Sequence, residues 1–329
     1  MNETVRRVGI VGIGNVGKAA ASAIVHNNIA DELYISDIDA ERAKGEAWDF
    51  ADSIELTPSR TRVIEVPLEG LAACDVILVA VTERSQIPTQ SRLELLKGTA
   101  AIAYDIVPKL RKAGFKGNYV IATNPCDIIT YLFYTLSGLP KNHVIGTGTA
   151  LDSMRLRRQL SQVIGDVDPR SISAFMVGEH GDSQIAAWSQ VTVGGQPLDQ
   201  FEEDNVDEFG PIDRDQVENA ARHFGWEIHK RKGNTQFGIG NELAFFAKSI
   251  LNDARAVTAA SVIQDGEYGQ HDLAIGVPII LGRNGVEKII KFRLNEKEQE
   301  GFNASAELIK GYIKQTLEEH EEQAANETV

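Results

Sequence analysis

The chain has 329 residues, of which 43% are hydrophobic and 24% are charged, so it is long enough for two globular domains. Its formal net charge of −14 argues against binding to nucleic acid or to an anionic membrane surface. The longest apolar runs, such as Val76–Val81, are too short to cross a bilayer, and we expect no signal peptide at the N-terminus. Cys74 and Cys126 lack the spacing of a disulfide framework or a metal site, so we expect reduced thiols in a cytoplasmic protein.

The first half of the chain alternates strand and helix patterns. Strands are predicted at Val8–Val11, Glu32–Ser36, Arg62–Glu65, Val76–Val81, Tyr119–Ala122 and Val144–Gly146. Helices are predicted at Val16–His26, Ala40–Ala51, Arg92–Leu110 and Cys126–Ser137. Pro108 should kink or divide the third helix. Because continuous β-branched runs alternate with helices, the pattern predicts an α/β fold with a doubly wound parallel sheet, as in a Rossmann domain.

A glycine pattern follows the first predicted strand and opens the first helix. The candidate cofactor-binding residues there are Gly12, Gly14, Asn15, Val16 and Gly17. The glycines allow a tight turn, close approach of the backbone to a pyrophosphate, and close packing of helix on strand. The alternative is a simple turn, but the flanking strand and helix favour a dinucleotide site, whose phosphates the helix N-terminus attracts.

Asp37 closes the second predicted strand at the spacing that a dinucleotide site requires. A carboxylate there can accept hydrogen bonds from the ribose hydroxyls and would repel a 2′-phosphate, so we expect NAD as the cofactor rather than NADP. The alternative is an aspartate that only caps a turn or a helix.

A polar segment, residues 82–92, follows the strand Val76–Val81. In a doubly wound sheet such a segment overhangs the nicotinamide end of the crevice. It ends in Arg92, whose charge suits an oxygen that becomes negative during reaction. The alternative is a solvated surface loop.

The pattern changes after Gly146, which predicts an NAD-binding Rossmann domain over residues 1–146 and an α+β substrate-binding domain over residues 147–329. Helices are predicted at Ser153–Ile164, Gln216–Arg231, Asn241–Ala254 and Glu296–Glu318, the last with a Glu-rich tail that should fray. Strands are predicted at Ile172–Val177, Ala187–Val193, Val257–Gln264, Leu273–Leu281 and Val286–Phe292. Glycine-containing turns between the last three indicate antiparallel pairing. We expect the acidic stretch 199–215 to be a solvated surface segment.

Asp152 and Arg155 lie at positions i and i+3 near the start of a predicted helix, so both project from one side. This spacing alone favours a surface ion pair. However, the run Gly146–Thr149 before the helix indicates a tight entry to a site, at the carboxyl end of a parallel strand, where ligand crevices form.

His180 lies between Glu179 and Gly181 at the end of an apolar strand, where a turn can present it to a cleft. An aspartate elsewhere can fix its tautomer and favour its charged form, and an arginine can hold an anion beside it. The alternative is an ordinary surface or core histidine. With Asp152 and Arg155 it would form a proton-transfer site for a carboxylate-bearing molecule.

Together these motifs resemble the lactate/malate dehydrogenase family over nearly the whole chain. The residues that carry the resemblance are the glycine pattern, Asp37, Asn124–Pro125, Gly146–Arg155 and Gly178–Asp182. The resemblance implies an NAD-dependent oxidoreductase that interconverts a 2-oxo acid and its L-2-hydroxy acid. It also implies a homo-oligomer, either a dimer or a tetramer.

The resemblance assigns a role to each of five candidates. His180 would donate and accept the proton, with Asp152 as its partner. Arg155 would clamp the substrate carboxylate, and Arg92 would polarise the carbonyl. Asn124 would contact substrate or nicotinamide near the reacting carbon.

The choice of substrate depends on Gln86, which falls where the lactate enzymes of the family have glutamine and the malate enzymes have arginine. A neutral side chain would leave a second carboxylate unpaired, so we expect pyruvate-like monocarboxylic acids rather than oxaloacetate. Thr235 matches the other pocket-lining position. The loop around Gln86 carries Glu83, Arg84 and Thr89 in place of the usual glycine-containing stretches.

Three alternatives stay open. The second half of the chain also resembles L-2-hydroxyisocaproate dehydrogenases, which take bulkier 2-oxo acids. A malate-type enzyme is a second alternative, and a non-catalytic dinucleotide sensor is a third. Among lactate enzymes, activation by fructose 1,6-bisphosphate uses a basic pair. Arg157 resembles one member, but Ser173 replaces the usual histidine, which predicts weak or absent activation.

Overall fold

Six parallel strands form one part of the main sheet, as the alternation of apolar strands and helices predicts. They are β1 (Arg7–Val11), β2 (Glu32–Ser36), β3 (Arg62–Glu65), β4 (Val76–Val79), β5 (Asn118–Ile121) and β6 (Val144–Gly146). Their order in the sheet is β3-β2-β1-β4-β5-β6 in this computed structural model, which describes residues 5–82, 92–165 and 167–327. The strand order reverses between β1 and β4, and ligands of such sheets bind at the carboxyl ends of the strands beside this reversal.

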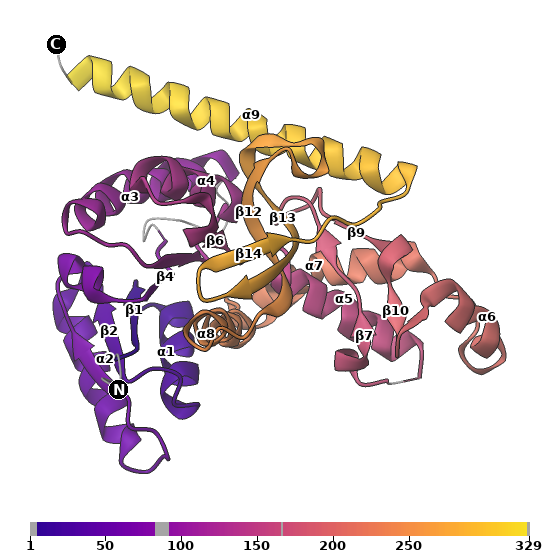
Figure 1. Cartoon of the computed structure of the whole chain (residues 1–329), viewed down its shortest axis with the longest axis horizontal. Coiled ribbons are helices and arrows are strands. Elements are labelled where there is room, and N and C mark those ends of the chain that lie inside the picture. The colour runs from indigo at the N-terminus through magenta and orange to yellow at the C-terminus, as the bar shows by residue number, and fades with distance from the viewer. Residues whose placement is uncertain (1–4, 83–91, 166, 328–329) are drawn as a thin grey trace.

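Helices cover both faces of this sheet. They are α1 (Asn15–His26), α2 (Ala40–Ile54), α3 (Arg92–Lys112) and α4 (Cys126–Ser137). In Figure 1, α3 and α4 lie on one side of the sheet, and α1 and α2 lie on the other. Of the two outcomes expected at Pro108, division does not occur, because α3 is one helix up to Lys112. Val107 and Leu110, which are fully buried on either side of Pro108, hold this turn against the core.

The second half of the chain extends the same sheet. The strands β12 (Ala256–Asp265), β13 (His271–Gly282) and β14 (Gly285–Ile289) pair antiparallel, as the glycine-containing turns predict. β12 joins the parallel strands through one antiparallel pairing, between Ser261 and Gly146, so the sheet has nine strands in the described part of the chain. The division into domains at residue 146 stays a prediction.

The α-helices described in this half are α5 (Ala150–Val163), α6 (Leu198–Phe209), α7 (Arg214–Lys232), α8 (Phe237–Leu251) and α9 (Glu296–Glu327). The acidic stretch 199–215 lies at the surface, as expected, and most of it forms α6. The rings of Phe201 and Phe209 stack on each other and pack against a smaller core, which gives this acidic helix one apolar face.

The strands predicted at Ile172–Val177 and Ala187–Val193 are shorter than expected. The short strands are β7 (Ile172–Ser173), β8 (Met176–Val177), β9 (Ile185–Ala186), β10 (Thr192–Val193) and β11 (Gln196–Pro197). β7 pairs with β10 and β8 pairs with β9, so a single apolar run contributes to two small sheets and bends between them. Periodicity alone does not reveal such a change of partner.

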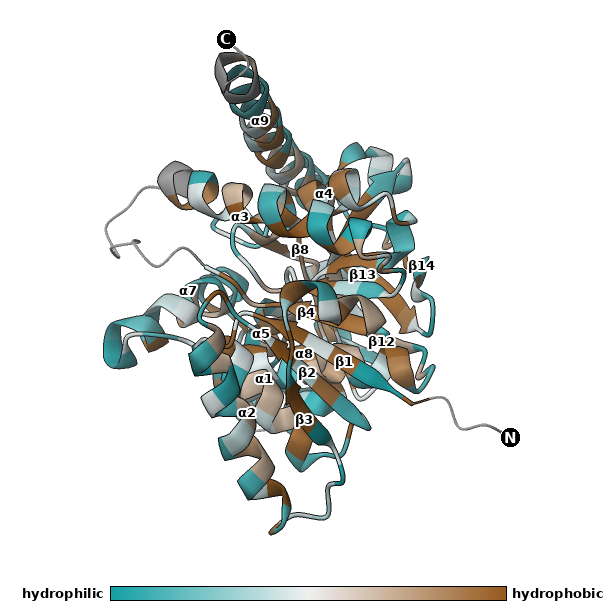
Figure 2. Ribbon diagram, turned by 90° about the vertical axis from the view of Figure 1, so that its left-hand side faces the viewer, coloured by the Kyte–Doolittle hydropathy of each residue, from teal (hydrophilic) through white to brown (hydrophobic). Residues whose placement is uncertain are grey.

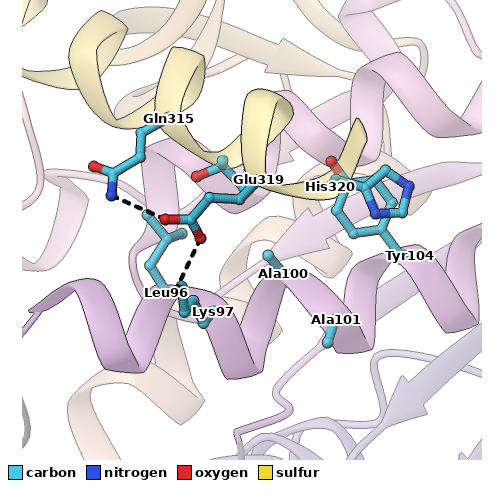
Figure 3. A pocket seen from close by; sticks show the side chains of 9 residues that line it. Leu96, Lys97, Ala100, Ala101, Tyr104, Gln315, Glu319 and His320 are labelled. Carbon is cyan, nitrogen blue, oxygen red and sulfur yellow. Dashed lines mark hydrogen bonds and ion pairs between the residues drawn. The ribbon is translucent and has the colours of Figure 1, made fainter. Parts of the chain in front are cut away.

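Helix α9 extends past the predicted end at Glu318 and crosses α3, with a cavity of about 270 Å³ between them (Figure 3). Glu319 forms an ion pair with Lys97 at 3.4 Å, and the His320 ring stacks on Tyr104 at 3.5 Å. These contacts hold a part of α9 that the Glu-rich sequence predicts to fray. None of the described helices is long and apolar enough to span a membrane.

Hydrophobic residues concentrate along the strands, and hydrophilic residues on the outer helix faces (Figure 2). Buried side chains of β1, β2, β4 and β5 form the centre of the larger core. The sheet fixes the loops at the carboxyl ends of its parallel strands, where the glycine turn, Asp37 and Asn124 lie.

Candidate active site

A cavity of about 350 Å³ lies beside the loops that follow β5, β6 and β8. Its lining residues are Leu95, Asn124, Pro125, Asp152, Arg155, His180, Gly181, Asp182, Gln184, Arg222, Gly225 and Trp226. The structure therefore brings together His180, Asp152, Arg155 and Asn124, which are separated by up to 56 positions in the sequence. The other eight lining residues are not among the predicted site residues.

The loop that carries His180 is anchored on both sides. Gly178 exchanges two backbone hydrogen bonds of 2.9 Å with Gly276 of β13. The backbone N–H of Glu179 donates to the Ser305 hydroxyl of α9 at 2.7 Å. His180 thus leaves the sheet on a fixed backbone, and its side chain is 27% exposed at the cavity.

Asp152 joins His180 to Arg155. Its Oδ2 accepts a hydrogen bond from His180 Nδ1 at 2.7 Å, and its Oδ1 accepts one from the Arg155 guanidinium at 2.8 Å. The Asp152 side chain is 2% exposed and that of Arg155 is 12% exposed. The two residues do form an ion pair, but it is largely buried, so the surface location that the i, i+3 spacing favours is wrong. Because Asp152 holds Nδ1, the Nε2 atom of His180 is the one available to a ligand.

The charges of this cluster stabilise one another. Burial by itself lowers the pKa of His180, but the carboxylates of Asp152 and Asp127 raise it by more, so the net shift is upward. Burial by itself raises the pKa of Asp152, but the charges of His180 and Arg155 hold it below its usual range. His180 therefore keeps its proton to a higher pH than an ordinary histidine does, and it lies beside an ionised aspartate.

Asp127 is a functional candidate that sequence reasoning missed. It lies in the first turn of α4 and is 1% exposed. Its Oδ2 accepts a hydrogen bond from the His180 backbone N–H at 2.7 Å, and its Oδ1 accepts one from the Ser261 hydroxyl at 2.6 Å. The only signal in the sequence is its place directly after the pair Asn124–Pro125 and Cys126.

The glycine turn between β1 and α1 fits a dinucleotide. A Cβ at Gly17 would overlap the carbonyl oxygen of Gly12, so the helix packs on the turn more closely than any side chain allows. At Gly14 a Cβ would meet nothing within 4 Å, which leaves open space over the backbone. The helix N-terminus at Asn15 and Val16 has no side-chain cap, so its N–H groups can bind phosphate.

Asp37 lies beside this turn, as expected, and is 5% exposed in its side chain. Its carboxylate accepts hydrogen bonds from the backbone N–H groups of Ile13 at 2.8 Å and Asp39 at 3.0 Å, and pairs with Arg42 at 2.7 Å. Burial alone would raise its pKa, but these donors lower it. The carboxylate stays ionised and fixed where a ribose would lie.

The remaining candidates are not placed in the cavity. Gln86 lies outside the described residues, and so does the side chain of Arg92, whose backbone begins α3. Thr235, between α7 and α8, is half-buried but is not among the described residues that line the cavity. Arg157 donates to the carbonyl of Ala174 at 3.0 Å, next to the exposed Ser173.

Glu242 of α8 is a second buried carboxyl that the sequence did not point to. It is 1% exposed, and neither carboxyl oxygen has a hydrogen-bond partner among the described residues. Burial raises its pKa well above the usual value, and the charge of Asp152 adds to this shift while Arg155 opposes it. The folded protein therefore keeps Glu242 protonated at a pH where the unfolded chain ionises it.

We expect Glu242→Met to raise the free energy of unfolding by about 1–4 kcal/mol at pH 8. At this pH the unfolded chain has ionised Glu242, so folding must return a proton to it, and methionine removes that cost. A carboxyl whose pKa is raised by folding costs stability only above its unfolded pKa, so the gain should shrink as the pH falls toward 4.5. Urea unfolding of both proteins at pH 5 and pH 8 measures the difference in the free energy of unfolding. Glu203→Met, at an exposed position of α6, is the control, and an equal gain there would contradict the argument.

Two family models match nearly all of the chain. The model described as lactate/malate dehydrogenase, NAD binding domain, matches residues 6–146. The model described as lactate/malate dehydrogenase, alpha/beta C-terminal domain, matches residues 149–320.

Individual relatives agree over almost their full lengths. L-lactate dehydrogenase 3 of Bacillus cereus is 46% identical over 314 residues, which cover 95% of this chain and 99% of that protein. L-lactate dehydrogenase 2 of Listeria monocytogenes is 41% identical over 308 residues, with 94% and 98% covered. The crystal structure of the minor L-lactate dehydrogenase from Enterococcus mundtii is 37% identical, has a TM-score of 0.90, and is matched over 95% of this chain and 99% of that one.

Proposed function

Because the chain belongs to the lactate/malate dehydrogenase family, we propose that it is an NAD-dependent L-lactate dehydrogenase, which interconverts pyruvate and L-lactate. The observation that carries this proposal is the shared carboxylate of Asp152. It binds His180 on one oxygen and Arg155 on the other, at the wall of one cavity. The names of the relatives support L-lactate as the hydroxy acid.

In the direction of reduction, protonated His180 donates its Nε2 proton to the carbonyl oxygen of pyruvate. Asp152 stabilises the imidazolium and fixes the ring, because its Oδ2 accepts the Nδ1 hydrogen bond at 2.7 Å. NAD, when bound, supplies or accepts the hydride. The glycine turn and Asp37 would hold its pyrophosphate and ribose. In the reverse direction, neutral His180 takes the proton from the lactate hydroxyl.

Arg155 binds the substrate carboxylate in this proposal. Its guanidinium presents several N–H donors in one plane, and only one end is engaged with Asp152. A bidentate pair with the carboxylate fixes the carbonyl carbon relative to both His180 and the nicotinamide. Asn124, which lines the same cavity, contacts the substrate or the nicotinamide.

The roles of Arg92, Gln86 and Thr235 rest on the sequence. Arg92 polarises the carbonyl oxygen as negative charge develops there. The family resemblance assigns Gln86 and Thr235 to substrate recognition, and the neutral amide of Gln86 would disfavour a second carboxylate. We further propose that the protein works in the cytoplasm as a homo-oligomer.

The proposal is tested by a comparison of 2-oxo acids. With NADH as the reductant, kcat/KM should be highest for pyruvate and at least about tenfold lower for oxaloacetate, whose second carboxylate is unpaired beside Gln86. Phenylpyruvate and 2-oxoisocaproate complete the series, and oxidation of NADH at 340 nm measures each rate. A preference for 2-oxoisocaproate would instead assign an L-2-hydroxyisocaproate-type enzyme, and inactivity on all four would leave only dinucleotide binding.

A further inference from the structure

We propose that Asp127 is a positioning residue for His180, a second carboxylate that fixes the histidine loop and helps to keep the imidazole protonated. This inference rests on the proposed function only where it predicts kinetics. Its central measurement is the titration of His180 itself, which requires no substrate.

Asp127 of α4 and Asp152 of α5 both hold the histidine loop. The carboxylate of Asp127 accepts the backbone N–H of His180 at 2.7 Å, while Asp152 accepts the ring Nδ1 at the same distance. His180 is therefore hydrogen-bonded at its backbone to one carboxylate and at its ring to another. Both aspartates are 1% exposed, so water screens neither charge effectively.

The second oxygen of Asp127 is also fixed. The Ser261 hydroxyl of β12 donates to Oδ1 at 2.6 Å, and Ser261 pairs with Gly146 just before the turn into α5. The carboxylate thus lies where α4, β12 and the histidine loop meet. A side chain needed only for packing there would not have to be charged, and burying a carboxylate carries a cost.

The charge of Asp127 has an effect on His180 that a neutral side chain would not have. His180 is surrounded by the charges of Asp127 from α4 and of Asp152 and Arg155 from α5, and Glu179 of its own loop lies close to Asp127. Burial and Arg155 disfavour the imidazolium, and Asp152 and Asp127 favour it. Asp127 thus opposes the two effects that would deprotonate His180.

Asp127 is itself able to titrate close to neutral pH. Burial raises its pKa to about 6, against the lowering by its hydrogen bonds with Ser261 and His180. Its charge is therefore present above pH 6 and is lost below it. Support for the imidazolium should be strongest at neutral pH, where an ordinary histidine loses its proton.

Asp127→Asn separates the charge of Asp127 from its hydrogen bonds. The amide oxygen can still accept the His180 N–H, and the amide nitrogen can donate to the Ser261 hydroxyl oxygen. We expect the pKa of His180 to fall by at least about half a unit in this variant, since a buried opposite charge has been removed. The protein with ¹³Cε1-labelled histidine should show this in its NMR titration, with His180→Gln identifying the resonance among the seven histidines.

The kinetic consequence follows from the same shift. The pH above which KM for pyruvate rises should move down by the same half unit, so KM at pH 8 should increase about threefold. The two proteins should converge at about pH 5 and below, where Asp127 of the wild type is mostly protonated. Asp199→Asn removes the same charge from the exposed first turn of α6 and should leave both profiles unchanged.

A purely structural role for Asp127 would give a different pattern. The variant would then lose activity by the same factor at every pH, and the pKa of His180 would be unchanged. That result would overturn the proposal. If the variant does not fold, the wild-type titration of His180 still tests the coupling. It should contain a second inflection near pH 6 from Asp127, and its absence counts equally against the proposal. If the wild type fails to reduce pyruvate, the proposed substrate is wrong, and the NMR titrations stand.

Discussion

Replacing His180 with glutamine is expected to lower kcat for pyruvate reduction by a factor of about 10²–10⁴, because the proton donor is lost. Glutamine has nearly the length of histidine and keeps a polar side chain at the cavity, but it cannot transfer a proton. Stopped-flow measurement of NADH oxidation at saturating pyruvate gives the rate. Fluorescence titration should show that NADH binds within about twofold of the wild type, since affinity depends on the glycine turn and Asp37.

Two further variants make this result specific. Asp152→Asn should also cost about 10²–10⁴ in kcat, because the imidazolium loses a buried carboxylate at 2.7 Å and the ring loses its fixed tautomer. His26→Gln, at the exposed end of α1, is the control and should leave kcat unchanged. A His180→Gln enzyme with more than about a tenth of wild-type kcat would show that another group supplies the proton.

The fold was predictable because its strands are apolar runs that alternate with helices. The strand Val76–Val79 and the buried Val8–Val11 have no polar face, which is typical of a central parallel strand. The glycine turn and Asp37 were predictable because each has a physical role at a fixed spacing from a strand. Predictions were less accurate at 172–193, where one apolar run serves two small sheets.

The candidate site was only partly predictable, and the reason is distance in the sequence. The Asp152–Arg155 pair is local, and His180 is conspicuous between a glutamate and a glycine. Asp127 accepts a hydrogen bond from the backbone of a residue 53 positions away, and the sequence contains no pattern for such a bond. Gly225 leaves room for the Arg155 guanidinium because it has no side chain, and Glu242 is buried without a hydrogen-bond partner among the described residues. Neither property is visible before the chain is folded.

Replacing Arg155 with lysine should raise KM for pyruvate by about 10²-fold, although the positive charge is kept. An ammonium group makes single hydrogen bonds and cannot form the planar bidentate pair with a carboxylate. It would also be drawn toward Asp152, which the wild-type guanidinium contacts at 2.8 Å with one nitrogen while others remain available. Initial rates over a wide range of pyruvate concentrations measure KM, and kcat at saturation should fall less than kcat/KM.

Two variants distinguish lost geometry from lost charge. Arg158→Lys, on the exposed side of the same helix, is the matched control and should leave KM unchanged. Gly225→Ala keeps Arg155 but places a Cβ 3.0 Å from its guanidinium. The guanidinium must then shift, and KM should rise by a smaller factor than in Arg155→Lys. If Arg155→Lys lowered kcat with KM unchanged, Arg155 would act on the transition state rather than on the bound carboxylate. A rise in KM with both Arg155→Lys and Gly225→Ala, but not with Arg158→Lys, makes the orientation of the guanidinium the property that selects a 2-oxo acid.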